Sequence, residues 1–498
     1  MITKDFILGY GAGKAAGGGG GGSGGSGEND VTFYDYDGSI VTSYSAADFA
    51  ALTEMPANPS HEGLTAQGWN WSLTDAQTYV AANGKLNIGQ TYITADGKTR
   101  IYIQLEAGRL SPYLGLFVNG EVAVDWGDDS AEETVTGSSL TTLVNTPHSY
   151  ASAGEYVVAI RVVSGGFEFS NSTSGKLING GFGNDSRSVT YSNAIQHVRL
   201  GSGITTIKNQ TFEGFRSIKT ITIPNGVTLS GVGIFQYCVS LSSIVIPSGV
   251  TTIPMYAFQY CYSLRSISLP KSITSFSDNP FSDCSSLVSI TVPSGVTSLP
   301  GNFVSGCNAL TSVVIPNGVT TLNNGCFRNC RSLTSISIPS SVTTIRDYMF
   351  YDCNSLSSII LPIGVTTLGS SSFYNCYALA SASVPKTGGS MFYGCSALRS
   401  VTFLDSPTEI SGGAFYDCRS LTSIVIPESV TTIGGNAFYQ CYGLGFVKFE
   451  SSTPPSVSSN TFSNVPTDCV FYVPAGSLSA YTGATNYPSS GTYSYVEY

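Results

Sequence analysis

The sequence predicts a mainly β protein in which a solenoid of 23-residue coils follows two small β-rich domains. The cysteines give the period. Seven of them, from Cys238 to Cys376, lie 23 residues apart, and Cys395, Cys418 and Cys441 continue the series after one step of 19. Apolar residues repeat in the same register. Self-similarity at one period of this size indicates stacked coils that bury a shared core.

Composition and charge exclude several classes of function. Only 11% of the residues are charged, and 42% are hydrophobic. Residues 1–200 carry 10 of the 22 basic and 20 of the 32 acidic side chains, which leaves 12 of each sign in residues 201–498. A neutral half does not suit nucleic acid, which requires a basic face. No apolar run approaches the ~20 residues that span a bilayer, so membrane insertion is not expected either.

The start of the chain is a peptide on a tether. Residues 1–16 form a docking peptide or a tail, and their apolar run is too short for a secretory signal, so export by that route is not expected. Residues 17–27 (GGGGGGSGGSG) form a flexible linker that cannot bury apolar surface.

Residues 28–96 form a first small domain. A hairpin is expected around Asp37 and Gly38, and the run LTDAQTYVAAN predicts a helix that stops at Gly84. The strand, the Pro-rich turn and the pair GW before Asn70 resemble the Listeria–Bacteroides repeat. That resemblance implies a spacer domain with a β-grasp-like fold, and we expect its two tryptophans to lie in its core.

Residues 97–165 form a second small domain of alternating strands. The run VDWGDDS at 124–130, followed by HSY at 148–150 and GEY at 154–156, resembles the PKD domain. That resemblance implies an immunoglobulin-like β-sandwich, in which His148 packs or hydrogen-bonds internally.

The turn of this second domain holds a weak candidate calcium site. Calcium takes clustered carboxylate oxygens, and three carboxylates stand close together here: Asp125, Asp128 and Asp129. The favoured alternative is that these aspartates cap backbone amides of the turn.

The solenoid is predicted over residues 195–450, after a linker or leading cap at 166–194 and before a C-terminal cap at 451–498. Its repeat is L-x-x-I-x-I-P-x-x-V-T-T-I-x-x-x-x-F-x-x-C-x-x, and each coil is named below by its first residue, with the leucine as position 1. The coils start at Ile195, Ile218, Leu241, Leu264, Leu287, Leu310, Leu333, Leu356, Leu379, Leu398, Leu421 and Leu444. Proline ends the strand in nine of the ten coils from 218 to 421, with Leu404 as the exception, because it has no N–H for the ladder. Coil 379 lacks four residues, so we expect a kink or notch there.

This repeat resembles the BspA-like leucine-rich repeat family, which is found in bacterial surface proteins and adhesins and in phage-encoded proteins. The resemblance implies a leucine-rich-repeat solenoid. The cysteine of each coil stands in an apolar Phe–Cys–Leu cluster, and Phe215 holds its register in the first coil. We therefore interpret the cysteines as buried, unreactive thiols.

One outward position, directly after the phenylalanine, is tyrosine in five consecutive coils: Tyr351, Tyr374, Tyr393, Tyr416 and Tyr439. Tyr377 and Tyr442 stand nearby in sequence. These tyrosines either stack between coils and stabilise an edge or form an amphipathic platform that binds a ligand. The sequence leaves both interpretations open.

The sequence shows no pattern of catalytic groups, so we expect neither enzyme activity nor a cofactor. We expect an adhesin or receptor-binding protein that recognises a host cell-surface glycan or protein through the solenoid. The glycine-rich start and the mix of domains favour a virion component of the phage tail-fibre type, with residues 1–16 contacting other virion proteins. A bacterial cell-surface adhesin and a structural spacer or decoration subunit are the alternatives. The expected location is the virion tail or an extracellular surface.

Overall fold

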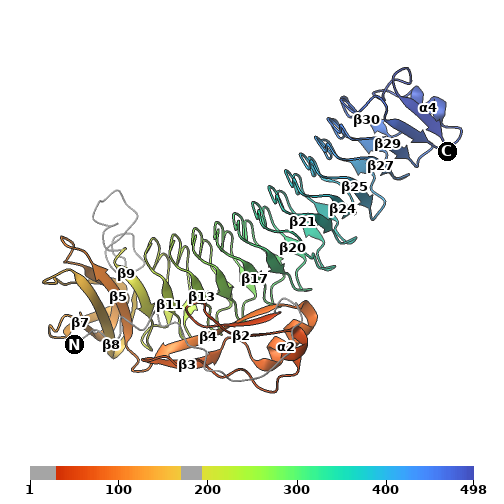
Figure 1. Cartoon of the computed structure of the whole chain (residues 1–498). Helices are drawn as coiled ribbons and strands as arrows, with labels where there is room; N and C mark the ends of the chain where they lie inside the picture. Colours follow the sequence, from red (N-terminus) through yellow and green to blue (C-terminus); the bar gives the residue numbers. More distant parts are fainter. Residues whose placement is uncertain (1–29, 170–192) are drawn as a thin grey trace.

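The structure is a computed structural model, in which residues 30–169 and 193–498 are described (Figure 1). The predicted docking peptide 1–16, the linker 17–27 and most of the predicted linker 166–194 lie outside the described residues. Figure 1 shows a long array of coils with one domain at its start and another along its side.

The solenoid is confirmed, and each strand pairs in parallel with its equivalent one coil away, as Ser243 does with Ser266. The main row of strands comprises β9 (Ile195–Arg199), β11 (Thr220–Thr222), β13 (Ser243–Val245), β15 (Ser266–Ser268), β17 (Ser289–Thr291), β19 (Ser312–Val314), β22 (Ser358–Ile360), β24 (Ser381–Val384), β25 (Ser400–Phe403), β27 (Ser423–Ile426), β29 (Phe446–Phe449), β31 (Val470–Val473) and β32 (Ser494–Glu497). A second row of two-residue strands comprises β10 (Thr206–Ile207), β12 (Thr228–Leu229), β14 (Thr252–Ile253), β16 (Ser275–Phe276), β18 (Ser298–Leu299), β20 (Thr321–Leu322), β21 (Thr344–Ile345), β23 (Thr367–Leu368), β26 (Glu409–Ile410), β28 (Thr432–Ile433) and β30 (Ser456–Val457).

Stacked phenylalanines fill the core of the solenoid. Phe350 and Phe373, for example, lie 5.3 Å apart with ring planes 16° from parallel, and both are fully buried. Val304 interrupts the stack, and the preceding residue, Phe303, supplies the missing ring by packing edge-on at 5.6 Å from Phe281. Each buried aromatic side chain contributes roughly 1.5–3 kcal/mol through the apolar area it removes from water.

The cysteines do more than fill space. All twelve are buried thiols outside any disulfide. In each coil from 218 onward, the ladder thiol donates to the carbonyl oxygen at the Phe position of the preceding coil, as Cys376 Sγ does to Phe350 O at 3.1 Å. Cys326, outside the ladder, donates to Pro300 O at 3.1 Å. A thiol is therefore both a small apolar group and a hydrogen-bond donor between coils.

The end of the solenoid differs from the prediction. The parallel ladder does not stop near residue 450, because Val447 pairs with Phe471 and Phe471 in turn pairs with Tyr495. The predicted cap thus holds two further coils and a short helix, α4 (Leu478–Thr482). These last coils are slightly longer than the regular repeat, so the 23-residue pattern does not identify them in the sequence.

The main row of strands opens at coil 333. Ser335 and Ser337 occupy strand positions but form no ladder within the described chain, whereas the second row stays continuous from β18 to β23. Val313 and Ile336, at inward positions, are only half-buried there. Figure 1 shows the array changing direction beyond β17. A bend therefore lies two coils before the shortened coil at which it was predicted.

The second domain differs from the predicted separate sandwich. It comprises β5 (Thr99–Leu105), β6 (Tyr113–Asp125), β7 (Glu133–Pro147) and β8 (Gly154–Phe169). These strands join the first two coils in one six-stranded sheet of order β11-β9-β5-β8-β6-β7, and one apolar core runs from them into the solenoid. The sequence pattern predicts these four strands, but it does not predict that β5 pairs with β9 of the solenoid. The domain therefore caps the array, and membership of the PKD family stays a prediction.

The first domain has its own core and sheet. It comprises β1 (Val31–Tyr34), β2 (Ile40–Tyr44), α1 (Ala46–Ala50), β3 (Leu64–Trp69), α2 (Leu73–Asn83) and β4 (Leu86–Thr94), with sheet order β2-β1-β4-β3 and β1 parallel to β4. The hairpin is confirmed. The helix is also confirmed, capped by the Ser72 side chain and ended by Gly84, whose φ of 86° suits glycine. Its resemblance to the Listeria–Bacteroides repeat stays a prediction.

This first domain lies along the solenoid, and β4 contacts β11, β13, β15 and β17. The approach is close, since a Cβ on Gly89 would lie 2.7 Å from the Val245 side chain. The predicted role as a spacer strung before the solenoid therefore does not match the structure, in which the domain covers the strand face of the first coils.

Candidate binding surfaces of the solenoid

The tyrosines after the core phenylalanines form one continuous row. Centroid distances between neighbouring rings, from Tyr351 to Tyr439, are 4.7, 4.5, 4.5 and 4.8 Å, with ring planes 3–26° from parallel. All five rings are half-buried, so each presents one side to solvent. The guanidinium of Arg328 lies 5.0 Å from the Tyr351 ring and ends the row in a cation–π contact. The stacking that the sequence left open is present.

Two further tyrosines extend the aromatic surface beside the row. Tyr377 and Tyr442 stand one residue after the cysteine of their coils and are 48% and 50% exposed. Desolvation by burial, followed by the neighbouring rings, raises the pKa of Tyr374. The hydroxyl of a tyrosine can both donate and accept a hydrogen bond, so the polar tips of these rings suit a polar partner.

A second stacked pair was not predicted. Tyr237 and Tyr260, one residue before their cysteines, lie 4.6 Å apart with ring planes 20° from parallel. Both have a positive φ, at a position that most other coils fill with Asn, Asp or Gly. The signal was visible in the sequence as tyrosines at equivalent positions of two consecutive coils, in a register different from that of the main row.

Proline creates a column of acceptors along the strand face. The carbonyl at position 6 of each coil would accept from position 7 of the next coil, where proline has no N–H. Where Leu404 replaces proline, its N–H does donate to Val384 O, at 2.8 Å. The first domain supplies donors to three consecutive position-6 carbonyls instead: Asn70 Nδ2 to Ile246 at 3.1 Å, Trp71 Nε1 to Leu269 at 2.8 Å, and the Tyr79 hydroxyl to Val292 at 2.6 Å.

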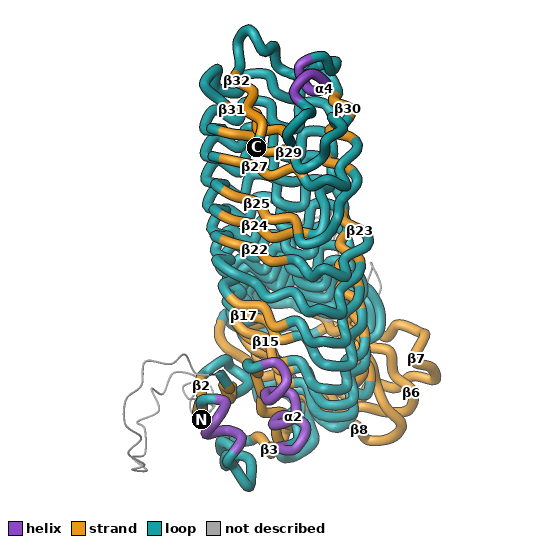
Figure 2. The backbone as a smooth tube through the Cα atoms, turned by 90° about the vertical axis from the view of Figure 1, so that its right-hand side faces the viewer, coloured by secondary structure: helices purple, strands orange, loops and turns teal. Residues whose placement is uncertain are grey.

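The strand face also carries a row of serine hydroxyls at position 3 that the sequence analysis missed. It runs through nine consecutive coils: Ser243, Ser266, Ser289, Ser312, Ser335, Ser358, Ser381, Ser400 and Ser423. The first domain bonds two of them, since Ser243 donates to Tyr36 O at 3.2 Å and Ser289 accepts from Asn87 at 3.2 Å. Figure 2 shows β22, β24, β25 and β27 one above the other beyond the part that this domain covers.

A groove of about 600 Å³ lies where the cover ends. It runs between β1 and the strand positions of coils 287, 310 and 333, next to the opening of the ladder. Asp30 and Lys85 stand on its first-domain side, and Ser312 and Ser335 on its solenoid side.

The predicted notch at coil 379 is confirmed. A cavity of about 390 Å³ lies between coils 356 and 398, where the shortened coil contributes only Pro385, Lys386 and Thr387. The second row of strands is interrupted there, between β23 and β26.

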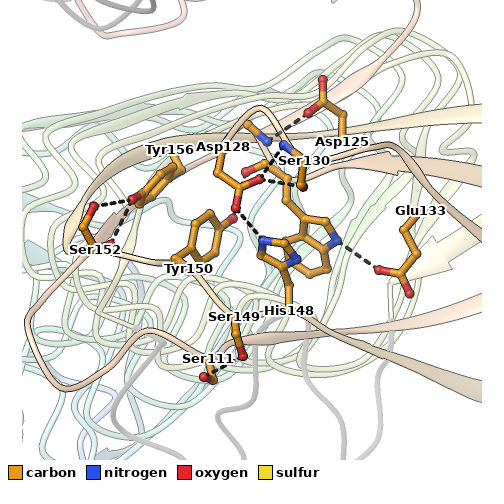
Figure 3. Close-up of polar contacts among 12 residues, drawn as sticks. Ser111, Asp125, Asp128, Ser130, Glu133, His148, Ser149, Tyr150, Ser152 and Tyr156 are labelled. Atoms are coloured by element: carbon orange, nitrogen blue, oxygen red, sulfur yellow. Dashed lines mark hydrogen bonds and ion pairs between the residues drawn. The ribbon is translucent and has the colours of Figure 1, made fainter.

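The candidate calcium residues act as turn caps (Figure 3). Asp125 accepts from the Gly127 N–H at 2.9 Å, and Asp128 accepts from the Ser130 hydroxyl at 2.6 Å and contacts His148 Nε2 at 2.8 Å. Asp129 holds the turn with a φ of 64°. Burial alone would raise the pKa of Asp128, but the hydrogen bonds from Ser130 and His148 outweigh it, so the pKa is lowered.

His148 packs as predicted, stacked on Trp126 at 4.7 Å. The other two histidines also form side-chain contacts. His61 contacts Asp35 at 2.6 Å, which raises its pKa although burial opposes the shift, and His197 contacts Thr220 at 2.8 Å. Burial, together with Lys219 and Arg199, lowers the pKa of His197 to about 4. Within residues 30–169 and 193–498, no group of three or more His, Cys, Asp or Glu side chains is placed to hold a metal ion.

None of the helices in the described ranges is long and apolar enough to span a bilayer. The described chain is thus a parallel β-solenoid with one capping and one covering domain. Residues 186–311, 298–411 and 381–475 match the BspA type leucine rich repeat region, and because these matches cover more than half of the chain, the protein belongs to that family.

Solved structures with similarity to the chain are also leucine-rich repeat proteins. One from Bacteroides ovatus is 26% identical, with 61% of this chain and 94% of that one covered and a TM-score of 0.43. A leucine rich cell surface protein from Faecalibacterium prausnitzii is 26% identical, with 58% and 87% covered and a TM-score of 0.38. A leucine-rich repeat protein from T. pallidum is 25% identical, with 36% and 78% covered and a TM-score of 0.29. No curated protein matches the sequence.

Proposed function

We propose that this protein is a non-enzymatic adhesin or receptor-binding protein that holds a glycan or protein of a host cell surface through the tyrosine row, Tyr351 to Tyr439. The single observation that carries the proposal is the continuous, half-exposed stack of five rings on one edge of the solenoid. Rigid aromatic side chains with a polar tip give large contact area at low cost in conformational entropy. Family membership supports the same role, since the BspA-like resemblance implies surface proteins and adhesins.

The row's composition supports a contact surface in addition to a structural stack. The same position is Gln236 and Gln259 in earlier coils, where the two amides hydrogen-bond to each other at 2.6 Å. The coil stack therefore forms without tyrosine at this position. At this position, directly after the phenylalanine, tyrosine occurs only in coils that lie beyond the first domain.

The test is a double variant, Tyr374→Ser with Tyr416→Ser, matched by Tyr237→Ser with Tyr260→Ser. The first variant removes four ring stacks and the second removes one, so at about 0.5–1.5 kcal/mol per stack the first variant should melt at the lower temperature. The full chain, fluorescently labelled, is applied to intact bacterial and epithelial cells, and melting is followed by circular dichroism. Loss of cell binding in the first variant alone, at a temperature at which circular dichroism shows both variants to be folded, supports the proposal. Equal binding by both variants, or unfolding of the first alone, contradicts it.

We extend the proposal to a phage tail-fibre component whose residues 1–16 attach it to other virion proteins. The glycine-rich segment 17–27 supports this, because such a tether lets a rigid solenoid search for its partner. Antibodies against the full chain should then label virions. Labelling of bacterial cells alone would favour the cell-surface adhesin, and the absence of cell binding in the assay above would favour a spacer or decoration subunit.

A further inference from the structure

The shortened coil 379 removes the part of the repeat that normally closes one side of the solenoid. In a regular coil, the run V-T-T-I after the proline supplies two inward apolar residues and the second strand, as Val430 and Ile433 do in coil 421. Coil 379 replaces the ten residues between proline and phenylalanine with six, KTGGSM. The two neighbouring coils keep their full arcs and become the walls of the notch.

The floor of the notch is built and fixed in place. Pro385, Thr387 and Pro407 are buried there. The Thr387 hydroxyl accepts from the Ser411 N–H at 2.9 Å, and the Ser411 hydroxyl donates to Thr387 O at 3.2 Å. These bonds join the short coil to the next one across the gap. The cavity is therefore a property of the folded stack and not of a loose loop.

The rim of the notch carries the polar chemistry. The ammonium of Lys386 donates to Thr366 O and forms one wall. Asp405 and Glu409 line the opposite side, are exposed, and form no ion pair with any described residue. Thr366 of coil 356 and Ser406 and Thr408 of coil 398 also line the notch with hydroxyls, and Ile363, 65% exposed, adds an apolar surface.

We propose that this notch is a binding site for one pyranose ring of a carbohydrate. Its volume of about 390 Å³ is within the range of sites that hold small organic ligands. Carboxylates accept hydrogen bonds from sugar hydroxyls, threonine and serine hydroxyls both donate and accept, and the proline and isoleucine surfaces suit the C–H faces of the ring. The site lies apart from the tyrosine row in position and in chemistry, so it stands whether or not that row binds a partner.

The probes are the methyl α-glycosides of glucose, galactose and mannose, and N-acetylglucosamine, each titrated into the full chain by calorimetry and saturation-transfer NMR. At least one should bind. Glu409→Gln and Asp405→Asn should each weaken that binding about tenfold, because each replaces a charged acceptor. Glu428→Gln is the matched control, since Glu428 holds in coil 421 the position that Asp405 holds in coil 398, away from the notch. It should leave binding unchanged.

A filled variant tests the geometry itself. Replacing Lys386–Met391 with the arc Ile363–Ser372 of the preceding coil restores the full length of a regular coil and should abolish binding while the solenoid melts normally. Absence of binding for all four sugars, or binding that survives both the filled coil and the two carboxylate variants, overturns the proposal. Binding of ethanolamine with the same carboxylate dependence, and of no sugar, also overturns it. If the filled variant does not fold, the point variants alone decide.

Discussion

The two halves of the solenoid are built from the same repeat but present different surfaces. In the first half, a capping sheet shares its core with the coils, and the first domain covers the strand face from β11 to β17. The second half carries the tyrosine row and the notch, and neither of the two N-terminal domains covers its strand row from β22 to β27 (Figure 2). The difference teaches that the inward residues fix the scaffold, whereas the outward residues decide which part of the scaffold contacts the two N-terminal domains.

The largest expected effect comes from alkaline pH, because both halves depend on buried thiols. Burial raises the pKa of Cys376 and its ladder neighbours, and raises that of Cys469 to about 12. Their stabilisation is complete below the unfolded-state pKa of about 8.5 and is lost as pH rises above it, by about 1.4 kcal/mol per thiol per pH unit.

Urea unfolding followed by circular dichroism between pH 7 and 10.5 should therefore show a steep loss of stability. Limited proteolysis should cleave the second half first, because it lacks the contacts of the first domain. A midpoint that is constant over this range would contradict the account of the thiols.

At neutral pH, truncation of one core phenylalanine in each half should show how the local stability of the two halves differs. Phe235→Ala and Phe373→Ala each remove a fully buried ring from between two stacked neighbours and should each cost about 3–5 kcal/mol. Native-state hydrogen exchange should show wider opening around Phe373, since repeat arrays open locally where neighbours give least support. Wider opening around Phe235 would show that the covering domain adds no support.

Removal of one hydrogen-bond donor of the first domain should weaken its contact with the solenoid without unfolding the coils. Trp71→Phe and Tyr79→Phe leave the carbonyls of Leu269 and Val292 without their donors, at a cost of about 1–3 kcal/mol each. Amide exchange in β13, β15 and β17 should rise. Trp69→Phe is the matched control, because its indole donates to Pro56 O inside the first domain. An equal rise in amide exchange in the Trp69→Phe control would contradict the idea that hydrogen bonds to the position-6 carbonyls hold the first domain on the coils.

The smallest effect is expected at the junction of the cap. A hydrogen bond from Arg100 lowers the pKa of Asp96 to about 2, although burial opposes it. The stabilisation is present above the unfolded-state pKa of about 3.9 and is lost as pH falls through about 2. Because the pair is partly exposed and screened, Asp96→Asn should cost about 0.2–1 kcal/mol at pH 7. The measurement is the melting temperature of Asp96→Asn relative to the unsubstituted protein at pH 7 and at pH 2.5. A larger decrease at pH 2.5 than at pH 7 would contradict the prediction.

Much of the solenoid could be predicted because its causes are local and repeated. The registers of Phe350, Cys376 and Tyr374 and the short coil all follow from one period, whereas the choice between stacking and binding at Tyr374 does not. The covering of the strand face could not be predicted, because Trp71 meets Leu269 across 198 residues and nothing near either residue records the other. The pairing of β5 with β9 could not be predicted for the same reason, since the sequence of an edge strand does not specify which distant strand it pairs with. The notch was predicted from length alone, but its lining depends on which arcs face each other across the gap.

The covering domain has a consequence for synthesis. It has its own core, so it can fold as soon as residue 95 or so has left the ribosome. Its docking surface, however, is not complete until β17 and Val314, which packs against that core, have been made. The first domain translated must therefore wait, with Trp71 and Tyr79 lacking their acceptors on the solenoid, until the capping strands and about 120 residues of coil (195–314) have been made. Because such distant contacts form late, the earliest part of the chain should be among the last to reach its final place.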